Sequence, residues 1–209
     1  FDRLGIGLSD PMPPDEKPTA AEWAAQCLSV LDGAEVERAY LVAHGGGGMP
    51  ALILSAQHPE RVAGFVSALS VSDYGITTGD AVAIELVRGS AVPGATTQVD
   101  FLAALAPSRA NDEGFRRWWN QAGQRGASPS VAQRLLEMQG TENVSHLVPE
   151  VAVPTLVLDR PDYDAGWLGG NPRFGAAIAG ARVVEVAGVD ALPWLPASDA
   201  VVAEIEDFV

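Results

Sequence analysis

A short apolar segment that runs straight into four glycines restricts the fold of this chain more than any other feature. Residues 38–43 read RAYLVA, His44 follows, and residues 45–48 are all glycine. The continuous apolar run predicts a strand buried on both faces. The next residues, PALILSAQHPERV, have the apolar spacing of a helix that ends near His58. A strand, a tight glycine turn and a helix are typical of α/β proteins with parallel sheets.

Further strands extend this pattern along the chain. The segment AGFVSALSVSD predicts a second buried strand, and because a helix joins it to the first, the two strands should be parallel. Two more buried strands are predicted at 153–159 and 181–188, and a helix at the end of the chain, SDAVVAEIEDFV, closes the domain. A helix over 19–32 has Thr19 as its predicted N-cap, and Ser128, directly before Pro129, is the predicted N-cap of a later helix. The fold class is therefore α/β, a parallel sheet flanked by helices.

A more polar, helical region interrupts the strands. Within residues 74–147 the candidate helices read FLAALA, FRRWWNQAG and SVAQRLLEMQG, separated by Gly, Pro and Ser. We expect a helical lid inserted between a first part of the α/β core, 1–73, and a second part, 148–209. The adjacent Trp118 and Trp119 lie in this lid, where they either pack against the sheet domain or line a pocket for an apolar ligand.

Composition and charge exclude several classes of partner. The 209 residues include 27 acidic and 13 basic ones, and the resulting net charge of −14 repels phosphate backbones and anionic membranes. No apolar run approaches the ~20 residues of a membrane span. Cys27 is the single cysteine, so no internal disulfide can form, and its place on an amphipathic helix predicts that it packs in the core. We expect a cytoplasmic protein without nucleic acid, metal or cofactor, since no metal-ligand spacing occurs either.

The glycine turn resembles a nucleotide-binding loop only in part. A P-loop requires Lys followed by Ser or Thr, and Met and Pro stand there instead. A dinucleotide fingerprint is matched by Gly46, Gly48 and Ala51, with Asp73 at the tip of the next strand. Adjacent glycines make such a match easy, but this alternative stays open.

A nucleophile elbow, G-x-S-x-G, is the third site with this layout. It is a strained turn that exposes a serine between a strand and a helix. The five positions are here occupied by residues 43–47, AHGGG, so that Gly45 stands where the serine would be. The elbow keeps its small residues but has no nucleophile.

Several phrases strengthen the comparison with one family. FDRLGIGLSDP, HPERV and VPTLVLD resemble segments that flank the elbow in α/β-hydrolases. SRANDEGFRRWW, RGASPS and VSHLVPEVAVPTLVL are similar to phrases of the hydrolase-like domains fused to class III adenylate or guanylate cyclases in actinobacteria. The first three strands of that family and its oxyanion loop have no counterpart here. We therefore expect RAYLVA to form an open sheet edge, covered by a missing N-terminal segment or a protein partner.

The resemblance also shows which parts of a catalytic triad are absent. Where the family has G-x-D-H-L-P-F with the catalytic histidine, this chain has GVDALPW, with Ala191 in its place. The acid is at best displaced, since Asp162 and Tyr163 align with the usual Gly-Asp pair and Asp164 follows. Loss of nucleophile or base from a serine triad costs on the order of 10⁶ in rate. The resemblance implies no triad hydrolase.

The leading hypothesis is a catalytically degenerate hydrolase-fold domain. It would act as a ligand-sensing or protein-interaction module, by analogy the regulatory part of a cyclase-type signalling protein. Its ligand, a small apolar molecule, would contact His44, Gly45, Gly46, Trp118 and Trp119. One alternative is an active hydrolase with unorthodox catalytic residues, drawn from the same histidine and the two aspartates of the displaced acid segment. Another is the dinucleotide-binding enzyme. A last one is that the native protein carries a serine and a histidine that were replaced by engineering.

Overall fold

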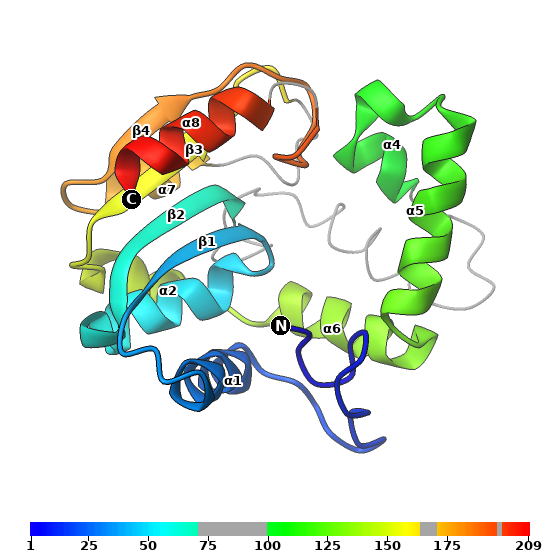
Figure 1. Cartoon of the computed structure of the whole chain (residues 1–209), viewed down its shortest axis with the longest axis horizontal. Coiled ribbons are helices and arrows are strands. Elements are labelled where there is room, and N and C mark those ends of the chain that lie inside the picture. Colours follow the sequence, from blue (N-terminus) through cyan, green and yellow to red (C-terminus); the bar gives the residue numbers. More distant parts are fainter. Residues whose placement is uncertain (71–99, 164–170, 196–197) are drawn as a thin grey trace.

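The computed structural model describes residues 1–70, 100–163, 171–195 and 198–209 (Figure 1). Within them lies a sheet of four strands in the order β1-β2-β3-β4, and each neighbouring pair is parallel. The strands are β1 (Ala39–Gly45), β2 (Val62–Ser70), β3 (Thr155–Asp159) and β4 (Arg182–Glu185). The predicted fold class, a parallel sheet flanked by helices, is confirmed.

Three helices cover one face of the sheet. They are α1 (Ala20–Gly33), α2 (Gly48–Gln57) and α7 (Asn171–Ala177). Phe65 of β2 and Val157 of β3 point into this layer, where Phe65 meets Phe174 of α7 edge to face, 6.3 Å between ring centres. Most of α2 is buried, as its run of apolar residues predicts. This layer is the larger part of the core.

The opposite face is covered by the C-terminal helix α8 (Ser198–Phe208). Alternation along the two inner strands directs Val66 of β2 and Leu156 of β3 to this side, where they pack with Val201 of α8. Both inner strands are thus buried on both faces, which explains why their sequences read as continuous apolar runs.

The outer strands are less buried than their sequences predict. In β1 the side chains alternate, and Val42 is 57 % exposed while the next residue, Ala43, is buried. β4 is largely exposed as well. The prediction of burial on both faces was therefore wrong for these two strands. The reason is position: in the described residues they are the edges of the sheet, and α8 reaches β1 only near Tyr40, whose ring lies against Phe208.

Local signals at two helix starts are confirmed. The Thr19 side chain accepts a hydrogen bond from Glu22 N, and the Glu22 carboxylate accepts one from Thr19 N, a complete capping box at α1. Ser128 caps the helix α6 (Pro129–Thr141) by accepting from Val131 N. Cys27 of α1 is half-buried against the core, as predicted.

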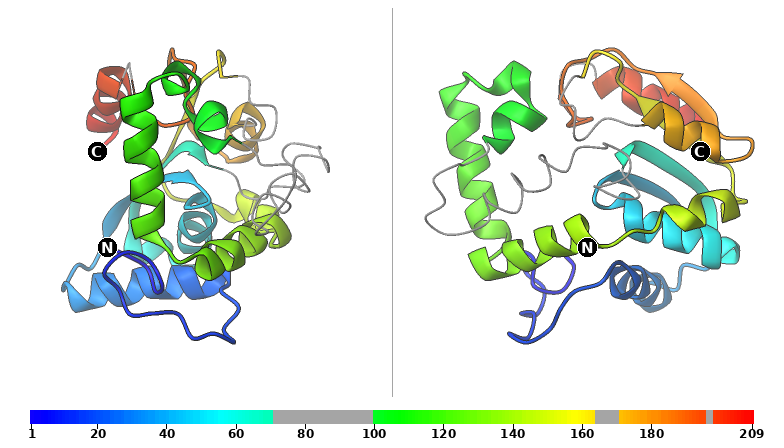
Figure 2. Two further views of the ribbon diagram at one scale, coloured as in Figure 1. Left: turned by 90° about the vertical axis from the view of Figure 1, so that its right-hand side faces the viewer. Right: turned by 180° about the vertical axis from the view of Figure 1, so that it is seen from behind.

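Helices of the predicted lid lie beyond the carboxyl ends of the strands. These are α4 (Phe101–Leu105), α5 (Glu113–Gly126) and α6, seen on the right of Figure 1 and the left of the second view in Figure 2. The strands of the sheet point toward α4 and α5 in both views. None of the helices described is both long and apolar enough to cross a membrane.

Candidate functional site

The turn between β1 and α2 is the centre of the candidate site. Gly45 has a φ of +52°, in the left-handed region that side-chain-bearing residues rarely adopt. The turn is closed by Gly47 N, which donates to His44 O at 3.0 Å. A Cβ placed on Gly45 would meet no heavy atom of the described residues within 4 Å. Glycine adopts this conformation readily, whereas a residue with a Cβ would be strained, and the position above it is open on the described side.

Gly46, the next residue, has the opposite surroundings. A Cβ placed there would lie 2.4 Å from Nε2 and 2.5 Å from Cδ of Gln139, a residue of α6. Real Cβ atoms do not approach other atoms so closely, so only glycine lets this carboxamide lie on the turn. A side chain of the predicted lid therefore touches the elbow segment directly.

His44 is held by the neighbouring strand. Its Nδ1 lies 2.9 Å from Ala68 O, and because a carbonyl only accepts, Nδ1 carries the proton and donates. The lone pair is then on Nε2. Burial lowers the pKa of His44, and the charge of Arg160 lowers it further, so the ring is neutral at pH 7. Trp194 meets this ring edge to face, 5.4 Å between centres.

Arg160 follows β3 directly and is only 4 % exposed. Its Nη1 donates to Asp190 O at 2.6 Å and to Leu192 O at 3.4 Å. Its Nη2 is buried and has no hydrogen-bond partner in the described part of the chain. Burial lowers the pKa of this guanidinium. A Cβ on Gly188, where φ is +142°, would lie 3.2 Å from Arg160 Cζ, so glycine allows the close approach.

The segment after β4 is bonded to α4 and the turn that follows it, both within the region predicted as a lid. The buried Asp190 carboxylate accepts from Ser108 N at 3.0 Å and from Ser108 Oγ at 2.7 Å. Ala191 is 1 % exposed, and its N–H donates to Leu105 O of α4 at 2.8 Å. The residue at the expected base position is thus enclosed by protein.

The two residues at the position expected for the triad acid differ in exposure. Asp162 is exposed, whereas the next residue, Tyr163, is buried and donates from its hydroxyl to Ala104 O at 3.2 Å. Asp164 and Asp73, named in the two rival hypotheses, lie outside the described residues.

The two lid tryptophans have different surroundings. Trp118 is 55 % exposed and contacts Phe115 at 5.2 Å between ring centres. Trp119 packs against a small cluster that contains Leu102 of α4 and Leu192. The adjacent indoles therefore do not share one environment, and it is Trp119 of α5 that contacts the cluster of α4 and the segment after β4.

Sequence reasoning missed three residues of this region. Gln139, Arg160 and Trp194 all contact the elbow or the segment after β4. Only Arg160 had a visible signal, because a basic residue directly after a buried strand lies at the edge where sites of parallel sheets form. No group of three potential metal ligands occurs in the residues that the structure describes.

Comparison with solved structures identifies the fold. An esterase from Rhodococcus sp. ECU1013 has a TM-score of 0.77 at 20 % identity, covering 98 % of this chain and 76 % of its own. A hydrolase from Oleispira antarctica has a TM-score of 0.80 at 12 % identity, covering 97 % and 78 %. Est816, described as an N-acyl homoserine lactone degrading enzyme, gives 0.72 at 21 % identity, covering 99 % and 80 %. The chain has the α/β-hydrolase fold.

Characterised relatives match only part of the chain. The 2-hydroxymuconate semialdehyde hydrolase of Pseudomonas putida is 38 % identical over 79 residues, 37 % of this chain and 28 % of that protein. The enzyme of the same name from Pseudomonas sp. (strain CF600) is 43 % identical over 61 residues, 29 % of this chain and 21 % of that protein. The matches thus span less than a third of either relative. No protein-family model matches the chain.

Proposed function

We propose that this chain is a non-catalytic α/β-hydrolase-fold domain that binds a small ligand above the elbow. The single observation that carries this proposal is Gly45, which has a left-handed φ and, among the described residues, no heavy atom within 4 Å of the place where a side chain would begin. A nucleophile elbow is a strained strand-to-helix turn that presents its central residue in this way. The turn has the geometry of the elbow, and its central residue has no atom that could form an acyl intermediate.

The surroundings of Ala191 support the same conclusion. Triad chemistry requires a base that takes the proton of the nucleophile. Ala191 cannot titrate, and its enclosure by α4 leaves no exposed position for a substitute at that place. Two of the three chemical roles are therefore unfilled at the positions that the family resemblance assigns.

The named relatives favour one rival, a hydrolase with other catalytic residues. In that case the neutral His44 would activate water through Nε2, since Nδ1 is engaged by Ala68 O. Its lowered pKa makes it a weak base, and no described carboxylate is bonded to it. The geometry therefore supports this rival less well than ligand binding.

The dinucleotide alternative also receives little support. The fingerprint works because its glycines let the pyrophosphate approach the backbone. Gln139 already occupies that approach at Gly46, and Gly48 is buried in the first turn of α2. A nucleotide would have to displace the lid side chain.

A regulatory role extends the proposal. The phrases shared with cyclase-fused hydrolase domains suggest that ligand binding serves signalling, and the contacts between the lid and the segment after β4 offer a route. Ser108 and Leu105 of the lid bond to Asp190 and Ala191, so a ligand that moves the lid would also move this segment. This part of the proposal rests on analogy.

A fragment screen with one matched variant tests the proposal. Asn tolerates the left-handed region, so Gly45→Asn fills the space above the elbow with little backbone strain. Ligand-observed NMR with a library of small aromatic fragments should find fragments that bind the wild-type chain and not the variant, with no turnover of ester members. Fragments that all bind equally to both proteins would contradict the proposal, as would ester turnover by the wild type.

A further inference from the structure

We propose that Arg160 binds a carboxylate group of the ligand, so that the site selects small aromatic or aliphatic acids. This inference rests on the proposed function and adds the chemical class of the ligand. It starts from one unusual group: a guanidinium that is almost fully buried and makes hydrogen bonds through one of its terminal nitrogens only.

Burial of a cation without a counter-ion is costly unless something compensates it. Within the described residues no carboxylate lies within 4.0 Å of Arg160, and its hydrogen-bond acceptors are the carbonyl oxygens of Asp190 and Leu192. Carbonyl dipoles compensate a full charge only in part. The Nη2 group, with two N–H donors, remains for an anionic partner.

Two other arginines contain a buried nitrogen atom but differ from Arg160 in their surroundings. Arg3 and Arg109 also have a buried nitrogen without a hydrogen-bond partner, each at Nε. Their guanidinium groups, however, lie over the rings of Trp23 and Phe115, 4.0 and 5.9 Å from the ring centres. Such rings attract a cation. Arg160 has no described aromatic partner of this kind. The nearby charge of Asp190 favours the protonated guanidinium and compensates it in part, but no described group accepts a hydrogen bond from Nη2.

The hydrogen bonds of Arg160 to the segment after β4 do not explain why Nη2 has no described partner. Nη1 alone makes the two bonds to the segment after β4. A lysine could donate both of these bonds from its single terminal nitrogen. Gly188 would then not be needed, since its lack of a Cβ makes room for the planar guanidinium, whose Cζ would lie 3.2 Å from that Cβ. An arginine in this place is suited to a planar oxyanion.

The position of Arg160 agrees with a site shared with the elbow. It follows β3, and only β2 separates β3 from β1, which ends at Gly45. With strands about 4.8 Å apart, the two strand ends are roughly 10 Å from each other. The charge of Arg160 is felt at His44, which bonds to β2 between them. A ligand a few bonds long would reach from Arg160 to the space above Gly45.

The apolar part of the ligand follows from what surrounds His44. Trp194, 56 % exposed, lies against the imidazole, and Val42, two residues before His44 on the same face of β1, is 57 % exposed. Apolar surface next to a single buried cation suits a monoanion with a hydrocarbon body. A phosphate dianion would call for more positive charge, and the neutral His44 supplies none.

A pair of isosteric probes tests this. Phenylacetate and phenylacetamide differ mainly in charge, and isothermal titration calorimetry on the wild-type chain should show at least tenfold tighter binding of the acid. Arg160→Met should abolish this preference, and Arg160→Lys should restore part of it. Because the preference is measured first on the wild type, the test does not depend on the folding of any variant.

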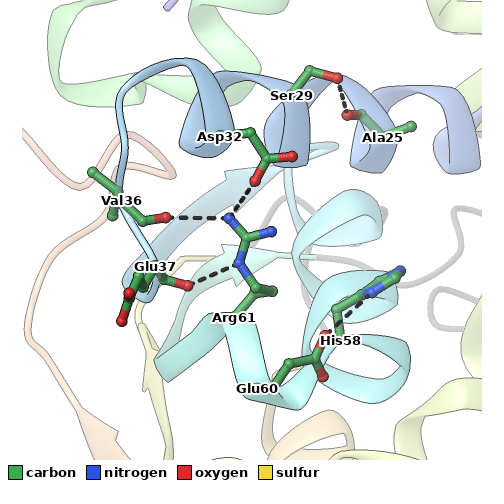
Figure 3. A network of polar contacts seen from close by, with 8 residues as sticks. All are labelled: Ala25, Ser29, Asp32, Val36, Glu37, His58, Glu60 and Arg61. Carbon is green, nitrogen blue, oxygen red and sulfur yellow. Dashed lines mark hydrogen bonds and ion pairs between the residues drawn. The ribbon is translucent and has the colours of Figure 1, made fainter.

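Arg61 provides the matched control (Figure 3). It too binds a loop through carbonyl oxygens, from Nε to Glu37 O at 2.8 Å and from Nη2 to Val36 O at 3.2 Å, and it pairs with Asp32. It lies at the start of β2, the opposite end of the sheet from Arg160. Arg61→Met removes a loop-binding arginine without touching the site, and the preference for the acid should persist.

Four outcomes decide the matter. Loss of the preference in Arg160→Met, with retention in Arg61→Met, supports the proposal. Equal binding of acid and amide by the wild type overturns it, as does a preference that survives in Arg160→Met, or the absence of phenylacetate binding at millimolar concentration. The proposed function fails separately, when no fragment distinguishes the wild type from Gly45→Asn.

Discussion

His44 Nδ1 donates a hydrogen bond to Ala68 O across the β1–β2 edge of the sheet, at 2.9 Å. This bond fixes the imidazole in one tautomer beside Gly45, and Trp194 covers the ring. The remaining lone pair of the ring is then on Nε2. In the proposed site, His44 would form a wall beside Gly45 and would not act as the base of a triad.

The same residue gives a pH prediction. Because burial lowers the pKa of His44 below its ordinary value of about 6.5, the unfolded chain binds more protons than the folded one below that pH. The free energy of unfolding should thus fall as the pH drops from about 6.5, by up to ~1.4 kcal/mol per pH unit from this group. Urea titrations at several pH values measure it. In His44→Gln, the contribution of His44 to the change of unfolding free energy with pH should vanish. An unchanged pH dependence would contradict the lowered pKa of His44.

Gly45 should be hard to replace on backbone grounds alone. Gly45→Ala meets no described atom within 4 Å, but a left-handed φ of +52° should cost it about 1–2 kcal/mol of unfolding free energy. Gly45→Asn should cost less. Gly123, inside α5 with open space around its Cβ position, is the control, and Gly123→Ala should stabilise by about 0.5–1 kcal/mol. Equal tolerance of Ala at both glycines would refute the strained turn.

The contact between Gly46 and Gln139 predicts coupling between the elbow and the lid. Gly46→Ala should destabilise the chain, and less so when Gln139→Ala removes the obstructing carboxamide. A double-mutant cycle in urea should give a coupling of about 0.5–3 kcal/mol. Gln133, on the same helix but bonded to Glu137, serves as the control and should show no coupling with Gly46. Additive effects of Gly46→Ala and Gln139→Ala would mean that the two residues do not touch.

Asp190 should be a major contributor to stability. Its buried carboxylate accepts two hydrogen bonds from Ser108, so Asp190→Ala removes two bonds to a charged acceptor and should cost about 1.5–3 kcal/mol. Thermal unfolding followed by circular dichroism measures the loss. Asp15 is exposed, and Asp15→Ala should change the melting temperature little. A similar, small effect of both substitutions would show that the Ser108 bonds contribute nothing.

How much the sequence could predict depended on how far apart along the chain the interacting residues lie. The caps at Thr19 and Ser128 depend on residues three positions away, and the order of strands and helices depends on apolar period, so both are readable. The exposure of Val42 depends on which strands lie next to β1; the family resemblance indicated an open edge there, but the local apolar pattern did not. Arg160 was missed for the same reason, since its partners lie 30 and 32 residues further along the chain.

The most direct test of the central claim is a measurement of ester hydrolysis by the purified chain. With 4-nitrophenyl butyrate, the account predicts that release of 4-nitrophenolate proceeds at the rate of buffer alone, since Gly45 supplies no nucleophile and Ala191 no base. Saturable turnover by the wild type that disappears in His44→Gln would contradict it.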